Sequence, residues 1–266
     1  MSALYVYAIV PSDAEEIAIS GIGGAPAYVV REGAVAAVVH DLPAAEPYRG
    51  SGDEIREAIT EHAAVVEAAW NAAGTVLPVT FDVLIAPSGA TPAADRLREW
   101  LRTEGEQLTA KLAALRGMTE LKVEIAIDPE FLPPSLEVEH ARADLQTRSP
   151  GGRRLFERKL AQLERDHAAA RAAELYAPIR RGLAAVSRDL TEHRRYRPRP
   201  PLVPILSASL LVPRDSVEEV GRTLAGLVDG HAYLAIRFLG PWPPYSFADL
   251  ASGVPRTLAE DPARPH

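Results

Sequence analysis

The chain has 266 residues, of which 47% are hydrophobic and 24% charged, a balance typical of a globular protein with one large domain or two smaller ones. It contains no cysteine, which excludes disulfides, thiolate metal ligands and cysteine nucleophiles. Its formal charge is −7 and no apolar run approaches the roughly 18–20 residues of a membrane span, so we expect a soluble cytoplasmic protein that binds neither nucleic acid nor membrane.

The first 117 residues alternate between strand and helix patterns. A short helix is predicted at 12–20, and a capping box formed by Ser51 and Glu54 begins a long helix. The apolar stripe of this long helix includes His62, which we interpret as a hydrogen-bonded core residue. Pro78 places the fourth predicted strand at an edge or a bulge. The strands are expected at residues 4–10, 27–30, 34–39 and 75–85.

A second long helix and a further set of strands follow. The helix is expected to begin at Thr91-Pro92, which supply a cap and a first-turn proline, and to end at Gly117. Residues 129–152 are polar and irregular, and we interpret them as a linker or mobile loop. Another helix is predicted from Asp215 to Gly230. The strands are expected at residues 119–128, 206–212 and 232–239.

The order of these elements indicates an α+β protein with two domains. Residues 1–117 are expected to form an N-terminal α+β domain with the ferredoxin-like order of elements. Residues 118–247 are expected to form a C-terminal modified ferredoxin-like domain that carries a helical arm at 153–196. Residues 248–266 are expected to be a C-terminal tail.

The helical arm is rich in arginine. Pro178 is expected to kink or split its helix, so that 179–190 continue as a second helix and the two form either an antiparallel arm or a bent rod. Residues 151–200 hold 13 basic and 6 acidic side chains, a net charge of +7. This charge indicates contact with an acidic partner or another copy of the chain, or else a solvated helix face. The candidate contact residues of the basic arm are Arg153, Arg154, Arg158 and Arg165.

The segment 240–247, Gly-Pro-Trp-Pro-Pro-Tyr-Ser-Phe, is stiffened by three prolines and carries three aromatic rings. We call it the strap. It is either a terminal segment that packs on the chain's own core or a rigid recognition element. Since it follows a strand in which Phe238 is expected to point inward, we expect Trp242 to be its main anchor. Its candidate residues are Trp242, Pro243, Pro244, Tyr245 and Phe247.

The sequence shows no signature of catalysis. The seven histidines are scattered without metal-ligand spacing, and there is no Walker loop, nucleophile elbow or kinase motif. We therefore expect no catalytic residue, no metal site and no cofactor.

Four stretches together resemble the gas vesicle GvpL/GvpF family. They are Leu4–Val10, Glu61–Val66 leading into Val76–Phe81, Ser149–Phe156, and the strap. One departure concerns the residues on either side of the strand phenylalanine. The family usually carries a basic residue and a glycine there, whereas this chain has Thr80 and Asp82.

The resemblance implies a non-enzymatic accessory protein of gas vesicle assembly, cytoplasmic and associated with the vesicle. It implies that the partners are the shell protein GvpA and other Gvp accessory proteins, and that the C-terminal domain is ferredoxin-like. Two alternatives stay open, a minor structural component of the vesicle wall and a regulatory module that binds a small ligand between ferredoxin-like sheets. The sequence leaves the choice between the GvpL and GvpF subtypes open.

Overall fold

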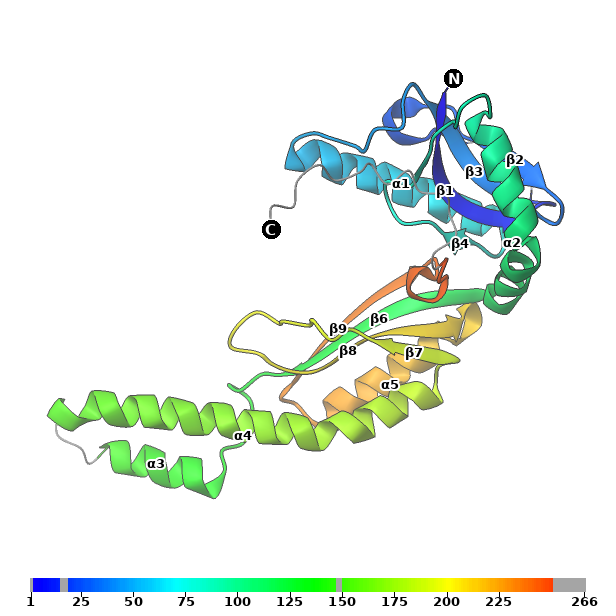
Figure 1. Ribbon diagram of the computed structural model, residues 1–266. Coiled ribbons are helices and arrows are strands. Elements are labelled where there is room, and N and C mark those ends of the chain that lie inside the picture. Colours follow the sequence, from blue (N-terminus) through cyan, green and yellow to red (C-terminus); the bar gives the residue numbers. More distant parts are fainter. Residues whose placement is uncertain (1, 15–18, 147–149, 251–266) are drawn as a thin grey trace. The chain divides into compact units, whose positions relative to one another are not determined.

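The computed structural model describes residues 2–14, 19–146 and 150–250, and combines helices with two β-sheets (Figure 1). The chain forms two compact units. The first comprises the described residues of 1–119 and 242–266, and the second comprises those of 120–241. We expected the C-terminal domain to extend to residue 247, but Trp242 and the residues after it lie with the first unit.

The sheet of the first unit is built around its first strand, which pairs antiparallel with neighbours on both sides. The predicted hairpin is confirmed and lies on one side of that strand. The predicted strand at 75–85 is wrong in detail, because only its two ends pair with the first strand and a turn at Phe81-Asp82 separates them. The strands are β1 (Ala3–Pro11), β2 (Tyr28–Glu32), β3 (Val35–Leu42), β4 (Leu77–Pro78) and β5 (Leu84–Ile85).

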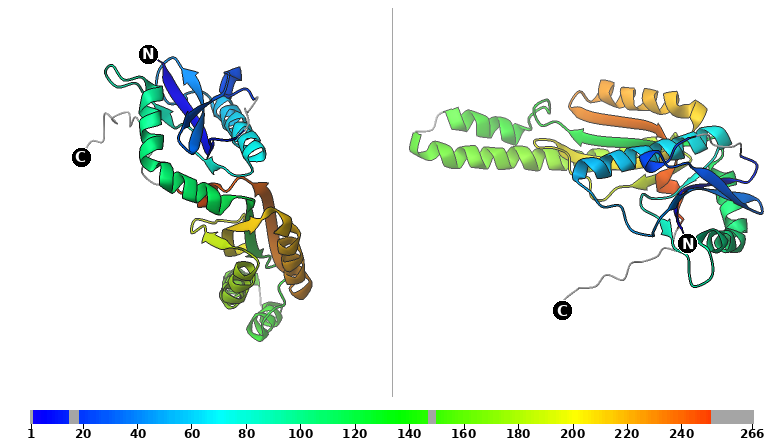
Figure 2. Two further views of the ribbon diagram at one scale, coloured as in Figure 1. Left: turned by 90° about the vertical axis from the view of Figure 1, so that its right-hand side faces the viewer. Right: turned by 90° about the horizontal axis from the view of Figure 1, so that it is seen from above.

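Two long helices lie on opposite faces of this sheet, α1 (Gly52–Ala73) and α2 (Ala93–Leu115) (Figures 1 and 2). The capping box at Ser51 and Glu54 is present, as predicted. The cap predicted for α2 is wrong: Pro92 is its N-cap residue and no side chain caps it. Since helices cover both faces, almost every side chain of β1 is buried, whichever face it points to.

The short helix expected at 12–20 falls largely on 15–18, which lie outside the described residues. The residues on either side of this gap form a turn after Pro11 and an isolated bridge between Ser20 and Pro26. A short 3-10 turn, η1 (Ile22–Gly24), follows.

Apart from one added helix after its first strand, the second unit has the strand–helix–strand–strand–helix–strand order of a ferredoxin-like fold, with strand order β7-β8-β6-β9. Helices α4 and α5 both pack on one face of this sheet, where leucine, isoleucine and valine side chains form the core. Period-two alternation places the polar residues of the central strands on the other face. The elements are β6 (Met118–Ile127), α3 (Leu136–Gln146), α4 (Pro150–Ala185), β7 (Asp189–Glu192), β8 (Val203–Pro213), α5 (Val217–Gly230) and β9 (Leu234–Trp242).

The segment interpreted as a linker, 129–152, instead contains α3 and the start of α4. Helix α3 runs beside the first half of α4 in the opposite direction (Figures 1 and 2). An ion pair of 2.7 Å joins Arg142 to Glu164, and Val138 is buried. The apolar stripe of α3 is too short to stand out among its charges, which is why the sequence pattern did not show it.

Pro178 does not split α4, which is one helix of 36 residues. Ile179 and Leu183, immediately after the proline, are buried in the core. We attribute the continuity to this burial, which offsets the backbone hydrogen bond that proline removes. The helix ends at Ala185, and 189–192 pair with β8 as a strand rather than continuing as a second helix. The arm is therefore the first half of α4 with α3 beside it.

The last strand is longer than predicted, because β9 continues through Gly240 and Pro241 to Trp242. It is an edge strand, where a proline is tolerated because its missing N–H faces away from the sheet. The expectation that Phe238 points inward is wrong, since its side chain is exposed. The buried residues of this segment lie where β9 begins, at Tyr233 and Leu234.

Candidate functional site

The strap is held by its prolines rather than by its tryptophan. Pro243 and Pro244 are buried, whereas Trp242 is 42% exposed and Tyr245 is 39% exposed. The hydroxyl of Thr119 donates a hydrogen bond of 3.0 Å to the carbonyl of Trp242. The expectation that Trp242 is the main anchor is therefore wrong, and its ring is half available to solvent.

The strap begins at a position that only glycine fits. Gly240 has a φ of 115°, and a Cβ there would lie 2.8 Å from the carbonyl oxygen of Glu120 on the neighbouring strand β6. Both the backbone conformation and the close approach of two strands thus require the absence of a side chain. After the buried prolines, a 3-10 turn η3 (Tyr245–Phe247) leaves Phe247 half-buried.

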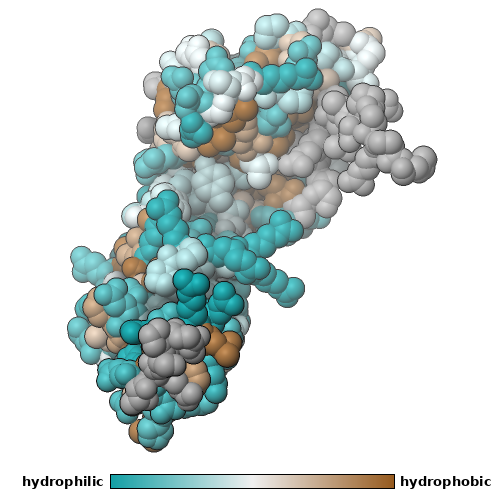
Figure 3. All heavy atoms as spheres, turned by 90° about the vertical axis from the view of Figure 1, so that its left-hand side faces the viewer, coloured by the Kyte–Doolittle hydropathy of each residue, from teal (hydrophilic) through white to brown (hydrophobic). Residues whose placement is uncertain are grey.

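The candidate arginines of the basic arm all lie exposed on the first half of α4. Arg153 pairs with Glu157 at 3.3 Å, and Arg165 donates to Gln162. Seen from its free end, the arm carries mostly hydrophilic side chains (Figure 3). The arm belongs to the second unit and residues 242–247 of the strap to the first, so each stands as a separate candidate.

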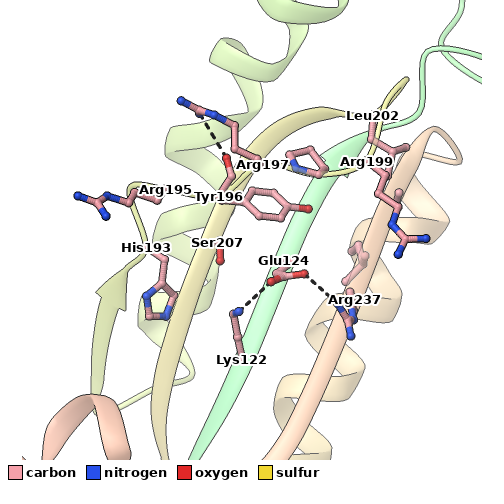
Figure 4. Close-up of a pocket in the computed structure, with 13 residues that line it drawn as sticks. Lys122, Glu124, His193, Arg195, Tyr196, Arg197, Arg199, Leu202, Ser207 and Arg237 are labelled. Atoms are coloured by element: carbon pink, nitrogen blue, oxygen red, sulfur yellow. Dashed lines mark hydrogen bonds and ion pairs between the residues drawn. The ribbon is translucent and has the colours of Figure 1, made fainter. Parts of the chain in front are cut away.

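A further candidate lies on the face of the second sheet that carries no helix. Residues of β6, β8 and β9 form its floor, and the loop 193–202 lies over it (Figure 4). The hollow has a volume of about 930 Å³. We call it the basic groove, and its charged lining residues are Lys122, Glu124, Arg195, Arg197, Arg199 and Arg237.

The basic groove holds five cations and one carboxylate. The Glu124 side chain is 13% exposed, and its carboxylate lies 2.9 Å from Lys122 Nζ and 3.7 Å from the Arg237 guanidinium. In the part of the chain that the structure describes, Arg195, Arg197 and Arg199 form no ion pair. The groove therefore has an excess of four positive charges on a chain whose net charge is −7.

Tyr196 extends over the floor of the groove, with Glu124 nearby (Figure 4). Burial raises the pKa of its phenol, and the nearby Glu124 carboxylate raises it further while Arg237 lowers it. The ring thus stays neutral near pH 7 and offers an apolar face with a hydrogen-bonding hydroxyl.

The sequence pattern assigned this charge to the helical arm, but much of it lies on the loop. Residues 193–202 contain four arginines, three prolines and no acidic residue, a signal that is visible in the sequence. Lys122 and Arg237 were missed, because they lie far apart in the chain and only the order of the strands brings them together. Among the described residues, no group of three or more histidine, aspartate or glutamate side chains is arranged to hold a metal ion.

The two described histidines of the first unit, His40 and His62, belong to its core. His62 is 3% exposed, and its Nε2 lies 3.0 Å from the carbonyl of Val79, so this nitrogen carries the proton. Its Nδ1 accepts from the hydroxyl of Tyr5 at 2.9 Å, and that hydroxyl accepts from the N–H of Asp82 at 3.0 Å. Burial lowers the pKa of His62 to about 4, against the smaller effect of the bond to Val79.

A second buried pair repeats this arrangement. The hydroxyl of Tyr7 lies 2.7 Å from Nδ1 of His40 and accepts from the N–H of Ile22 at 2.8 Å. Burial lowers the pKa of His40. The two pairs join β1 to α1, to β3 and to the loops, which confirms that His62 is a hydrogen-bonded core residue.

The departure at Asp82 has a backbone explanation. Asp82 has a φ of 69°, a conformation that favours glycine and that aspartate tolerates better than most residues. Its carboxylate also accepts a hydrogen bond of 3.2 Å from the N–H of Tyr48. The position at which the family usually has glycine is thus one where the turn needs a positive φ.

Comparison with known proteins gives consistent results. The model of the family described as gas vesicle synthesis protein GvpL/GvpF matches residues 3–249. Gas vesicle protein L1 of Halobacterium salinarum is 27% identical, with 92% of this chain and 89% of that protein covered. Gas vesicle protein F2 of the same organism is 26% identical, with 95% of each chain covered. Relatives of both subtypes therefore match.

Solved structures share the fold. The crystal structure of the gas vesicle protein GvpF from Anabaena sp. PCC7120 matches with a TM-score of 0.68 and 19% identity, over 95% of this chain and 98% of that one. The crystal structure of GvpF from Microcystis aeruginosa matches with a TM-score of 0.64 and 18% identity, over 93% and 99%. Within the described residues, no helix has the length and apolarity needed to cross a membrane.

Proposed function

Because this chain belongs to the gas vesicle GvpL/GvpF family, we propose that it is a non-enzymatic assembly factor that binds the shell protein GvpA and other Gvp accessory proteins in the cytoplasm. The observation that carries the proposal is the family match over 3–249, which spans both units. Membership in this family supports a role in gas vesicle assembly, and the named partners are the part that we propose.

The physical reason for such a partner lies in the shell itself. A shell subunit that buries its apolar face only in the assembled wall exposes that face while it is free, and exposed apolar patches and strand edges favour aggregation. A protein that covers these surfaces and then releases them keeps the subunit competent for assembly. The strap, with its half-exposed Trp242 and Tyr245, and the basic arm are the surfaces that we propose for contacts with partners.

Co-expression tests the proposal directly. A tagged copy of this chain is produced together with GvpA, and the GvpA that remains in the supernatant and that co-purifies is measured against GvpA expressed alone. We expect more GvpA in both fractions when the chain is present. If GvpA behaves identically with and without the chain, and no other Gvp protein co-purifies, the proposed function is wrong.

Washing assembled vesicles with urea separates this role from that of a wall component. An assembly factor is expected to be removed by the wash, whereas retention of the chain on washed vesicles would favour a structural component of the wall.

The absence of catalysis is tested at a histidine outside the buried core. His231 is half-buried, and its Nδ1 lies 3.2 Å from the hydroxyl of Tyr233. We expect His231→Ala to leave vesicle formation intact. A folded His231→Ala protein that still binds its partners but forms no vesicles would contradict a purely binding role.

A further inference from the structure

We propose that the basic groove binds an acidic segment of a partner polypeptide, and that Glu124 occupies the position of one of the partner's carboxylates when the groove is empty. That the partner is an assembly protein rests on the proposed function. The charge and the lining of the groove by themselves favour an anionic polypeptide.

The first step is the charge of the groove. Lys122 and Arg237 already hold one carboxylate, that of Glu124, and therefore show the geometry of carboxylate recognition. The loop arginines add three further cations that have no acidic partner among the described residues. Guanidinium groups suit carboxylates because their planar array of N–H donors matches the two oxygens. An excess of four positive charges therefore calls for an occupant with several negative ones.

The second step concerns the kind of anion. Surfaces that bind single-stranded nucleic acid place several aromatic rings along a basic channel so that successive bases stack. Tyr196 is the only tyrosine, phenylalanine or tryptophan among the residues that line the basic groove, and His193 adds one imidazole ring. Leu202 and Ala235 instead add small apolar surfaces between the cations. This mixture of single charges and aliphatic contacts fits a polypeptide better than a nucleic acid.

The third step is the free strand at the side of the groove. β9 is the last strand in the order of the sheet, so its outer backbone groups are not paired within the sheet. An extended segment can pair with such an edge, and alternate side chains then point to one face. Arg237 lines the groove from β9 and Arg199 lines it from the loop (Figure 4). A segment with alternating acidic residues along β9 would therefore meet both arginines.

Replacing Glu124 tests the inference, because the direction in which the affinity for an anionic segment changes shows which role Glu124 has. If it occupies the position of a carboxylate from the partner, Glu124→Gln frees Lys122 and Arg237, and anionic segments bind more tightly. The matched control is Glu218→Gln, which makes the same change of charge on an exposed part of α5, the helix that packs on the other face of the sheet. The double variant Arg199→Gln/Arg237→Gln is expected to weaken binding, with Arg181→Gln/Arg222→Gln, at exposed positions of α4 and α5, as its control.

The probe is a short fluorescein-labelled peptide of alternating Thr and Glu, with the Thr/Gln peptide as the neutral comparison, and binding is measured by fluorescence anisotropy. At about 0.01 M salt, we expect the Thr/Glu peptide to bind and the Thr/Gln peptide to bind much more weakly. Each exposed charge pair is worth up to about five-fold in affinity, so we expect about two- to five-fold tighter binding for Glu124→Gln and about five- to twenty-fold weaker binding for the double arginine variant. Both control variants are expected to stay close to the wild type, and melting temperatures verify that all variants fold.

Four outcomes would overturn the inference. The first is that the double arginine variant and its control lose affinity equally, because the groove is then not the binding site. The second is that Glu124→Gln weakens binding, because Glu124 then organises the cations instead of competing with the partner. The third is an oligothymidylate that binds more tightly than the peptide and displaces it, which would indicate a nucleic-acid site. The fourth is salt-sensitive self-association that the double variant abolishes, which would make a second copy the occupant.

These results are independent of the test of the proposed function. If the peptide binds as expected but no Gvp protein co-purifies with the chain, the groove is an acidic-peptide site with a different partner. If GvpA co-purifies equally with the wild type and with the double arginine variant, and the peptide does not bind, only the groove inference fails.

Discussion

His62→Gln is expected to reduce the loss of stability that the first unit suffers as the pH falls. In the folded protein the pKa of His62 is about 4, below its ordinary value of 6.5, because burial penalises the charged ring. Between these values the unfolded chain binds a proton that the folded chain does not. The stabilisation is therefore fully present above about pH 6.5 and is lost as the pH falls toward about 4.

The structure gives the size of this effect. A shift of about 2.5 units corresponds to about 3 kcal/mol, at about 1.4 kcal/mol for each unit. The hydrogen bonds agree with the sign, because the hydroxyl of Tyr5 donates to the unprotonated Nδ1 of His62 while it accepts from Asp82. A proton on Nδ1 would place two donors against each other. Glutamine at this position keeps one donor and one acceptor but does not titrate.

Tryptophan fluorescence makes the measurement specific to the first unit. Trp70 and Trp100 lie on the helices of this unit, and Trp242, the last residue of β9, is grouped with it, so urea unfolding followed by tryptophan emission reports mainly on the first unit. We expect the free energy of unfolding of the wild type, minus that of His62→Gln, to rise by about 3 kcal/mol from pH 4 to pH 7.

Tyr5→Phe provides the matched control, because it removes the hydrogen bond to His62 but leaves the titrating ring. We expect it to cost about 1–3 kcal/mol near neutral pH and to retain the steep dependence on pH. If the stabilities of wild type and His62→Gln run parallel between pH 4 and pH 7, the reasoning from burial to pKa to stability is refuted.

The other predictions concern the strap and the basic arm. Gly240→Ala is expected to lower the melting temperature of the second unit, and Gly33→Ala that of the first, both followed by circular dichroism. The decrease for Gly240→Ala is expected to be larger by several degrees. Both glycines have a positive φ, but only the Gly240 Cβ would collide with a neighbouring strand, so equal losses would contradict this argument. Trp242→Ala is expected to lower the free energy of unfolding by no more than about 2 kcal/mol, measured by urea unfolding and circular dichroism, because the residue is 42% exposed. Replacing a fully buried tryptophan by alanine would cost about 3–5 kcal/mol. Arg154→Gln/Arg158→Gln is expected to weaken the binding of a partner to the arm at low salt and to have little effect at high salt. Partner affinity that does not change with salt would exclude the arm as a contact surface.

Much of the first unit could be predicted from local sequence patterns. The capping box at Ser51, the strand β1 and the hairpin of β2 and β3 all have signals that span only a few residues. The role of His62 followed from its place on the apolar stripe of α1. These features depend on backbone propensity and on the period of apolar residues, which are properties of the segment itself.

The errors lie where distant residues decide the local structure. Pro178 does not break α4 because the residues after it are buried on the sheet, and residues 189–192 are a strand because β8 is available to pair with them. Trp242 resembles an anchor in the sequence, yet the buried residues of the strap are Pro243 and Pro244. In each case the energy of burial or pairing exceeds a local preference of about 1–3 kcal/mol.

The sequence by itself determined the class of the fold, the family motifs and the excess of positive charge between residues 151 and 200. Only the tertiary structure decided where that charge acts. The order β7-β8-β6-β9 places Lys122 and Arg237 on neighbouring strands and brings the loop arginines over them, although more than 100 residues separate the two strand residues in the chain. The physical reason is that a binding surface depends on which side chains share a face, and strand pairing between remote segments sets that face.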